Sequence, residues 1–179
     1  MKLSLSAGAR PLVLGLSVSI GIVIVAAAGQ IATSPALPIF LFPELPSGVA
    51  ADLRSRGCGI AREYTMRNHK NVLRGDFTGD HYEDWAVLCI AGQQAYVLVY
   101  ARGRAPAAVL STAPLTIPQS AEAGNSIRIV DRTYVADHNR SADLQSLRKD
   151  AHCVEDAIGM GSSIYCSVDS QWIRYAGAD

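Results

Sequence analysis

Residues 72–89 constrain the fold of this chain more than any other stretch, because an acidic loop there separates two apolar runs. The loop is rich in acidic and small polar residues, which favour turns. The second apolar run, residues 85–90, contains Trp85 and Cys89 and reads as a strand. The stretch therefore predicts a β-hairpin with the acidic loop at its tip.

Oxygen-bearing residues alternate along this loop. Counted from Asp76, side-chain oxygens fall at positions one, three, five and nine, and position seven can offer a backbone carbonyl; these residues are Asp76, Thr78, Asp80, Asp84 and Tyr82. Calcium takes about 6–8 oxygen ligands, and a curled loop turns alternate residues inward. The sequence favours a metal-free loop, because the same residues form Asx-turns. The alternative is one weak calcium site at these residues, with a Kd on the order of 10⁻⁴–10⁻³ M.

Residues 76–87, DFTGDHYEDWAV, resemble the core of an FG-GAP or VCBS-type repeat, whose loop reads roughly D-x-[DN]-x-D-G-x-x-D and is followed by Leu-Ala-Val. The resemblance implies that Asp76, Asp80 and Asp84 are calcium ligands, with Thr78 in place of the usual Asp or Asn. His81 stands where the family has Gly at a turn position that needs a positive φ, which His tolerates at some cost.

The length of the chain limits what this resemblance implies for the fold. A β-propeller needs roughly 4–8 blades of four strands, and the residues after position 45 are too few to close one. We therefore expect an α+β fold, mainly antiparallel β with one short N-terminal helix, stapled by disulfides and not a full propeller.

The N-terminal residues 1–28 have the pattern of a signal peptide or a membrane anchor. Lys2 and Arg10 form a positive region, residues 11–28 are predominantly apolar, and Ala26 and Ala28 form an A-x-A site. The apolar run is also long enough to cross a membrane as a helix. In both interpretations the rest of the chain is exported. It is then either released into the periplasm or extracellular space, or tethered to the membrane through residues 11–28.

Four cysteines fit an oxidising compartment, in which disulfides persist. Four cysteines allow three connectivities, and proximity in the sequence favours Cys58–Cys89 and Cys153–Cys166. No two cysteines have the C-x₂-C spacing of a zinc site.

Between the leader and the hairpin we expect a linker and a helix. Residues 29–45 contain three prolines and are predicted to be an extended, Pro-rich linker to a single α+β domain at residues 46–179. A short helix begins at Pro46 or Ser47, places Val49, Ala50 and Leu53 on one face, and ends at Gly57.

Further strands are predicted after the hairpin from β-branched and aromatic residues and from alternation. They occupy residues 95–100, 126–130, 163–167 and 171–175, and residues 108–111 with 115–117 are either an edge strand or a loop. Residues 134–135 extend the strand at 126–130, a turn of helix is expected at 143–148, and turns are expected at 124–125 and 168–170.

The C-terminal third contains a second acidic segment. Asp156 aligns with Asp84, but Arg148 then occupies position one, so a second copy of the loop would have lost its metal; chance similarity is the alternative. The arrangement of E-D-A-I-G, S-I-Y and W-I-R-Y-A-G-A-D also resembles small exported proteobacterial proteins of unknown function. This second resemblance implies a compartment and a fold family, and no activity.

No catalytic motif is visible. Sixteen basic residues balance sixteen acidic ones, which argues against nucleic acid as a partner. The carboxylate pairs Glu83–Asp84 and Glu155–Asp156 are sequence neighbours, whose side chains point to opposite faces of a strand. The sequence therefore favours an exported, non-enzymatic domain that binds an envelope or extracellular partner. The alternative is a small exported hydrolase whose carboxylates or histidines are brought together by the fold.

Overall fold

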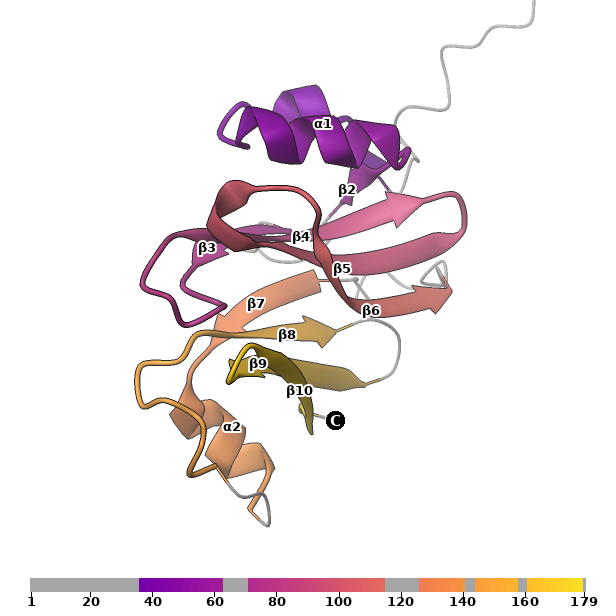
Figure 1. Cartoon of the computed structure of the whole chain (residues 1–179). Helices are drawn as coiled ribbons and strands as arrows, with labels where there is room; N and C mark the ends of the chain where they lie inside the picture. Colours follow the sequence, from indigo (N-terminus) through magenta and orange to yellow (C-terminus); the bar gives the residue numbers. More distant parts are fainter. Residues whose placement is uncertain (1–35, 63–70, 115–125, 141–143, 158–160, 179) are drawn as a thin grey trace, which may run out of the picture. The chain divides into compact units, whose positions relative to one another are not determined.

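The computed structural model describes residues 36–62, 71–114, 126–140, 144–157 and 161–178, which hold two antiparallel sheets (Figure 1). The first sheet has six strands: β1 (Ala36–Leu37), β2 (Gly59–Ala61), β3 (Val72–Gly75), β4 (Asp84–Ala91), β5 (Gln94–Tyr100) and β6 (Ala108–Pro114). The second sheet has four: β7 (Ser126–Val130), β8 (Cys153–Ala157), β9 (Ser162–Val168) and β10 (Gln171–Ala176). No propeller or closed barrel is formed by the described strands, which confirms the expected fold class.

The described elements form four layers, which are joined by three apolar clusters, one between each pair of neighbouring layers. The first cluster joins helix α1 (Ser47–Ser55) to the first sheet, the second lies between the two sheets, and the third joins the second sheet to helix α2 (Arg132–His138). The order is therefore α1, first sheet, second sheet, α2 (Figure 1).

Strand β4 shows why strands of the first sheet are apolar at successive positions and not only at alternate ones. Alternate side chains of a strand point to opposite faces. Trp85, Val87 and Cys89 pack towards α1, whereas Ala86 and Leu88 pack towards the second sheet. Both faces are thus covered, and every residue of β4 except its last is buried.

The predicted hairpin is present. Strands β3 and β4 pair antiparallel from Val72 opposite Val87 to Gly75 opposite Asp84. β5 and β6 continue from β4 as an antiparallel meander, and β9 and β10 form the predicted C-terminal hairpin. Alternation and β-propensity were sufficient to find these strands.

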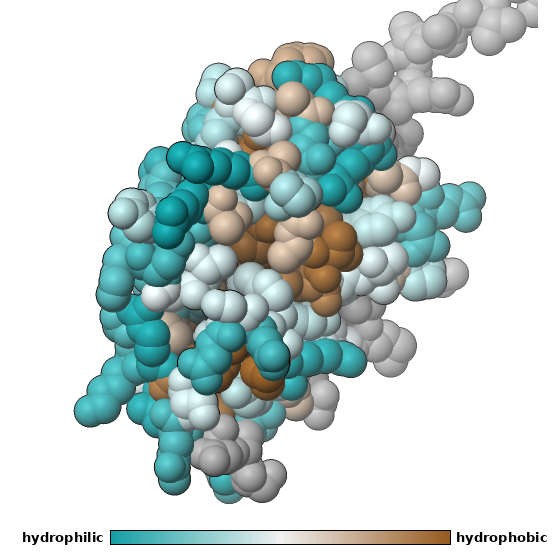
Figure 2. Space-filling view, viewed as in Figure 1, coloured by the Kyte–Doolittle hydropathy of each residue, from teal (hydrophilic) through white to brown (hydrophobic). Residues whose placement is uncertain are grey.

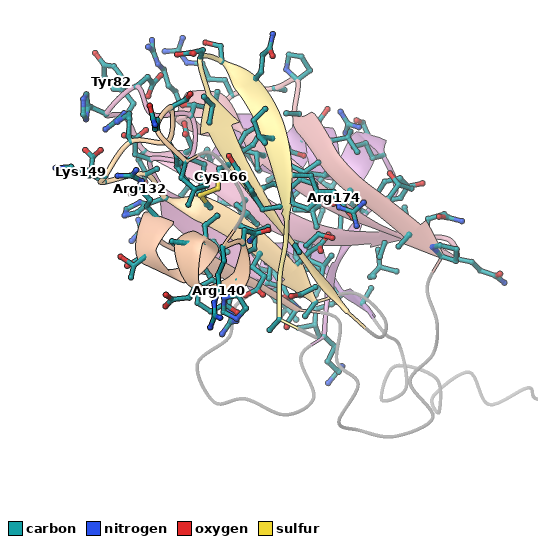
Figure 3. The ribbon with its side chains drawn as sticks, turned by 90° about the horizontal axis from the view of Figure 1, so that it is seen from below. Tyr82, Arg132, Arg140, Lys149, Cys166 and Arg174 are labelled. Carbon is teal, nitrogen blue, oxygen red and sulfur yellow. A yellow bond between two sulfur atoms is a disulfide. The ribbon has the colours of Figure 1, made fainter. Side chains whose placement is uncertain are left out.

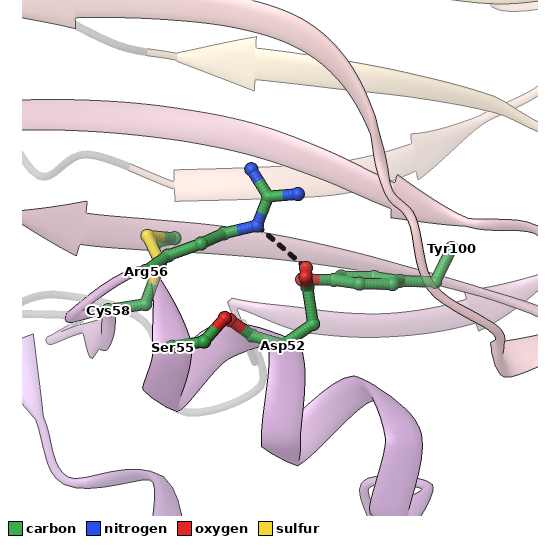
Figure 4. Close-up of a disulfide and its surroundings, with 6 residues drawn as sticks. Asp52, Ser55, Arg56, Cys58 and Tyr100 are labelled. Carbon is green, nitrogen blue, oxygen red and sulfur yellow. Dashed lines mark hydrogen bonds and ion pairs between the residues drawn. A yellow bond between two sulfur atoms is a disulfide. The ribbon is translucent and has the colours of Figure 1, made fainter.

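The predicted N-terminal helix is confirmed as α1, with Val49, Ala50 and Leu53 buried. Gly57 ends this segment with a φ of +68°, a conformation that favours glycine. Asp52 ties the helix to the first sheet, because its carboxylate accepts hydrogen bonds from the Tyr100 hydroxyl at 2.9 Å and from Arg56 Nε at 2.6 Å (Figure 4). Burial, reinforced by the bond to Asp52, raises the pKa of the Tyr100 hydroxyl.

The expected linker at residues 29–45 is wrong for its described half. Ala36 and Leu37 form β1 and pair with β2, and a short 3-10 helix, η3 (Ile39–Leu41), follows. Ile39 and Leu45 are buried in the cluster beneath α1. The prolines do prevent an α-helix, but two residues between prolines can still pair at a sheet edge.

The expected extension of β7 by Tyr134 and Val135 is also wrong, because these residues belong to helix α2. The side chain of Asp131 caps this helix by accepting the N–H of Tyr134 at 2.9 Å. Val135 is fully buried against the second sheet. The cap and this burial outweigh the strand preference of Tyr and Val. The protein therefore has two short α-helices among its described residues, where one was expected.

Some expectations concern residues outside the described ranges. These are the leader at 1–28, the first part of the linker, the strand at 115–117, the turn at 124–125 and the start of the helical turn at 143–148. None of the helices in the described part of the chain has the length and apolar content needed to cross a bilayer.

Both predicted disulfides are present. Cys58–Cys89 links the end of the α1 segment to β4, with 5.4 Å between Cα atoms, and Cys153–Cys166 links β8 to β9, with 4.5 Å. Two disulfides indicate an oxidising compartment outside the cytoplasm.

Replacing Cys153 and Cys166 together with alanine should lower the free energy of unfolding by about 2–3 kcal/mol, because the closed loop restricts the unfolded chain. Urea denaturation of the oxidised variant and wild type measures the loss. Both cysteines are fully buried in the cluster that contains Ile164 and Val135. If the variant unfolds at the same urea concentration as the wild type, the disulfide does not contribute to stability.

Candidate functional site

The loop between β3 and β4 is held to the body of the domain by Phe77. This side chain is 1% exposed and packs in the cluster between the two sheets. The loop turns through residues of positive φ, Gly79 at +78° and His81 at +64°. The predicted left-handed conformation of His81 is therefore confirmed. With Phe77 anchored, the acidic residues on either side of it are drawn together.

Three carboxylates meet in this loop. Asp76, Asp80 and Asp84 each offer one oxygen, and these oxygens lie within 4.8 Å of one another. Asp84, at the start of β4, is fully buried, whereas Asp76 and Asp80 are half-buried. The spacing seen in the sequence thus brings together the three carboxylates that it predicted as metal ligands.

Asp84 organises the loop through hydrogen bonds. Its Oδ2 accepts the N–H of Thr78 at 2.7 Å and the hydroxyl of the same residue at 2.8 Å. Its Oδ1 accepts the N–H of Arg102 at 2.8 Å. Arg102 belongs to η4 (Ala101–Gly103), which follows β5, so this one carboxylate fixes both the loop and the end of the neighbouring strand.

Turns of the kind that a metal-free loop would use are also present. Asp80 Oδ1 accepts the N–H of Tyr82 at 3.0 Å, which is an Asx-turn, and Asp76 Oδ2 accepts the N–H of His81 at 3.0 Å. The Tyr82 ring is exposed, with the Arg102 guanidinium 4.3 Å from its centre. The predicted ligand Thr78 donates its hydroxyl hydrogen to Asp84.

Two arginines that the sequence did not single out for this loop face its carboxylates. Arg102 Nε lies 2.7 Å from Asp80 Oδ2; this bond, with that from the N–H of Tyr82, holds the pKa of the Asp80 carboxyl below its ordinary value. Arg148 donates to the carbonyl of Gly79 and lies 3.7 Å from Asp76 Oδ2.

Arg148 brings a second loop to the first. Figure 3 shows Tyr82 and Lys149, one from each loop, at the same end of the molecule. His152 also faces the acidic loop, where its Nδ1 accepts the N–H of Asp76 at 3.3 Å. The alignment placed Arg148 at the first position of the second acidic segment, but only the fold shows that it lies against the first one.

One oxygen of the cluster has no partner in the described part of the chain. Asp76 Oδ1 is buried and receives no hydrogen bond from any described residue, although Oδ2 of the same carboxylate accepts the N–H of His81. A buried carboxylate oxygen without a donor is costly, and a bound cation is one way to satisfy it. This oxygen is the feature of the loop that best fits a metal ion.

The second acidic pair separates as the pleat of a strand requires. Glu155 faces α2, where Arg128 Nε, the Tyr134 hydroxyl and the Ser162 hydroxyl donate to it. Asp156 points to the other face, where it accepts the N–H of Ser163 at 3.1 Å.

The two carboxylates that hydrolysis would need are dispersed. Asp80 and Asp156 bond to different partners in different parts of the fold. Two of the described histidines do contact the acidic loop: His81 Nδ1 lies 3.7 Å from Asp76 Oδ2, and His152 Nδ1 accepts the N–H of Asp76. Both of these histidines are exposed, as is His138.

Comparisons with models of protein families, with curated proteins and with solved structures found no match to this chain.

Proposed function

We propose that this protein is an exported, disulfide-stapled, non-enzymatic module whose β3–β4 loop binds one calcium ion weakly. The observation that carries the proposal is the buried Oδ1 of Asp76, which has no hydrogen-bond donor among the described residues. It lies in a cluster whose three carboxylates each place an oxygen within 4.8 Å of the others. The module would act on an envelope or extracellular partner. Residues 1–28 would direct its export and then be cleaved or anchor it through residues 11–28.

The charges around the loop explain why the affinity would be weak. Two guanidinium groups already compensate three carboxylates, and Arg102 occupies Asp80 Oδ2. Calcium would have to compete with Arg102 for that oxygen, and the two Asx-type bonds already hold the loop without it. These costs place the expected Kd on the order of 10⁻⁴–10⁻³ M, as in extracellular modules.

Binding is favoured over hydrolysis because the two histidines beside the carboxylate cluster, His81 and His152, are exposed, and Asp156 lies outside this cluster. The acidic loop offers three carboxylates that are hydrogen-bonded or ion-paired, and His152 there accepts a backbone N–H. A general acid–base pair needs a titrating group within reach of the proton that it transfers.

Adding a few millimolar calcium to the oxidised full chain should raise its Tm. A ligand that binds only the folded state stabilises it by RT ln(1 + [L]/Kd), which exceeds about 1 kcal/mol for a Kd of about 0.1 mM. Thermal melting with calcium, and then with chelator, measures the shift. Asp80→Ala should abolish it, and Arg102→Ala should enlarge it, because the competing guanidinium is gone.

Asp137→Ala is the matched control. Asp137 is an exposed aspartate on α2 that lies outside the carboxylate cluster, so the calcium response of this variant should equal that of the wild type. An unchanged Tm in the wild type, or an equal shift in Asp80→Ala, would show that the loop is a turn and not a calcium site.

A further inference from the structure

A cleft of about 750 Å³ opens between the two sheets, away from the acidic loop. Pockets for small ligands commonly measure about 300–1,000 Å³. The cleft is lined by β6 of the first sheet and by residues of β8, β9 and β10 of the second. Its lining includes Asp156, Arg174 and three serines, which distinguishes it from a gap in the core.

The edge of β6 forms one wall. Residues 109–113 line the cleft consecutively. Since side chains of a strand alternate between faces, a consecutive run lines a cleft when the edge of the strand faces it. β6 is the last strand of its sheet and pairs with β5, so the other side of its backbone has no strand partner among the described residues. Apolar side chains gather on the molecular surface below α1, over β5 and β6 (Figure 2), and Val109 of β6 is half exposed.

A buried carboxylate forms the floor. Asp156 on β8 is 4% exposed, and its carboxylate accepts the N–H of Ser163 at 3.1 Å. Ser111 of β6 lines the cleft with it, so residues of both sheets meet at the base of the cleft. Burial raises the pKa of the Asp156 carboxyl, against the lowering effects of Ser111 and of the Ser163 N–H.

A guanidinium and two aromatic rings complete the lining. Arg174 Nε and Nη2 both donate to the Ser163 hydroxyl, at 3.0 and 2.7 Å. Figure 3 shows Arg174 between the C-terminal strands and the first sheet. Trp172 lies two residues earlier on β10, therefore on the same face, and Tyr165 lies opposite Arg174 on β9.

We propose that this cleft binds a neutral, hydroxyl-rich ligand, namely a short oligosaccharide. Asp156 is the one carboxylate and Arg174 the one cationic group among the described lining residues, so the lining has no net charge. A sugar hydroxyl both donates and accepts, and can satisfy an acceptor and a donor that lie near one another. The apolar face of a sugar ring can rest on Trp172 or Tyr165.

Other ligand classes fit this lining less well. An anion would meet the buried Asp156 carboxylate, and a cation would meet Arg174. A wholly apolar ligand would remove water from both charged groups and would offer no hydrogen bonds in place of those that the water made. The proposal does not depend on the acidic loop, because none of Asp76, Asp80 and Asp84 lines the cleft.

Titration of the oxidised full chain with maltotriose, cellotriose or triacetylchitotriose tests the proposal. Two-dimensional ¹H–¹⁵N NMR should show saturable shifts of the Trp172 indole and the Ser163 amide for at least one trisaccharide, with a Kd of about 1 mM or lower. Arg174→Ala should weaken this affinity about tenfold or more, because a charge-assisted bond is lost.

Asp156→Asn separates binding from folding. The pKa of Asp156 is higher in the folded than in the unfolded state. The free energy of unfolding of the wild type therefore falls as the pH rises from the unfolded-state pKa through the folded-state pKa, because the carboxyl must ionise in a buried position. The Asn variant should therefore be at least as stable as the wild type at neutral pH, yet bind the trisaccharide about tenfold more weakly. Arg140→Ala, which removes an exposed arginine outside the lining, should bind normally (Figure 3).

Three outcomes would overturn the proposal. The first is the absence of saturable shifts with all three trisaccharides. The second is equal affinity in wild type, Arg174→Ala and Asp156→Asn. The third is a response only to an uncharged Val/Thr-rich peptide, with amide shifts along β6, which would instead assign the cleft to strand addition at the sheet edge.

Discussion

Replacing Asp84 with alanine should destabilise the protein by about 3–5 kcal/mol even without calcium. The fully buried carboxylate accepts three hydrogen bonds, two of them from the backbone N–H groups of Thr78 and Arg102. Alanine leaves these donors without their acceptor and releases the β3–β4 loop from the end of β5. Urea denaturation in chelator measures the loss.

Asp80→Ala is the control for this prediction, because it removes a carboxylate from the same cluster. Asp80 is partly exposed and its partner Arg102 is half exposed, so solvent screens their ion pair and the loss of stability should be much smaller. Equal losses in the two variants would mean that Asp84 contributes only its charge, and that its hydrogen bonds do not fix the loop.

Replacing Asn71 with alanine should cost about 3–4 kcal/mol. Asn71 is 3% exposed and precedes β3. Its Oδ1 accepts the N–H of Ile127 on β7 at 3.0 Å, and its Nδ2 donates to the carbonyl of Ala61 on β2 at 2.9 Å. One amide thus joins the two sheets and also joins two segments of the first sheet, and alanine removes a bonding partner from both of these backbone groups.

Asn139 offers a matched control of the same residue type. Its side chain also bonds to the backbone at Val135 and Ala176, but its bonds to Ala176 are exposed, so Asn139→Ala should cost only about 1 kcal/mol. Hydrogen exchange adds a local test, since the amide of Ile127 should lose protection in Asn71→Ala. Equal costs for the two asparagines, or a protected Ile127 amide, would contradict the bridging role.

The sequence predicted only some of the residues of the acidic-loop site, and there is a physical reason why it predicted these and not the others. Asp76, Asp80 and Asp84 lie within nine residues of one another, so the geometry of one loop is enough to bring them together. Arg102 and Arg148, which neutralise them, come from other elements and reach the loop through the packing of the sheets. Their positions had no local signal that pointed to this loop.

The cleft was missed for the same reason. Asp156 was noted in the sequence as a possible counterpart of Asp84, and its separation from Glu155 followed from the pleat of a strand. Its neighbours Ser111 and Arg174 are distant in the chain and meet it because β6 and β10 border the same gap between the sheets.

The sequence by itself determined the hairpin at β3 and β4, most of the other strands, helix α1 and the two disulfides, because alternation, helical periodicity and closeness along the chain act within short segments. Tertiary structure decided the burial of residues 39 and 45 in the core, the helical state of residues 134–135, the bridge made by Asn71 and the partners of the acidic loop. These features depend on which apolar faces meet when the layers pack, and that choice is made between segments far apart in the chain.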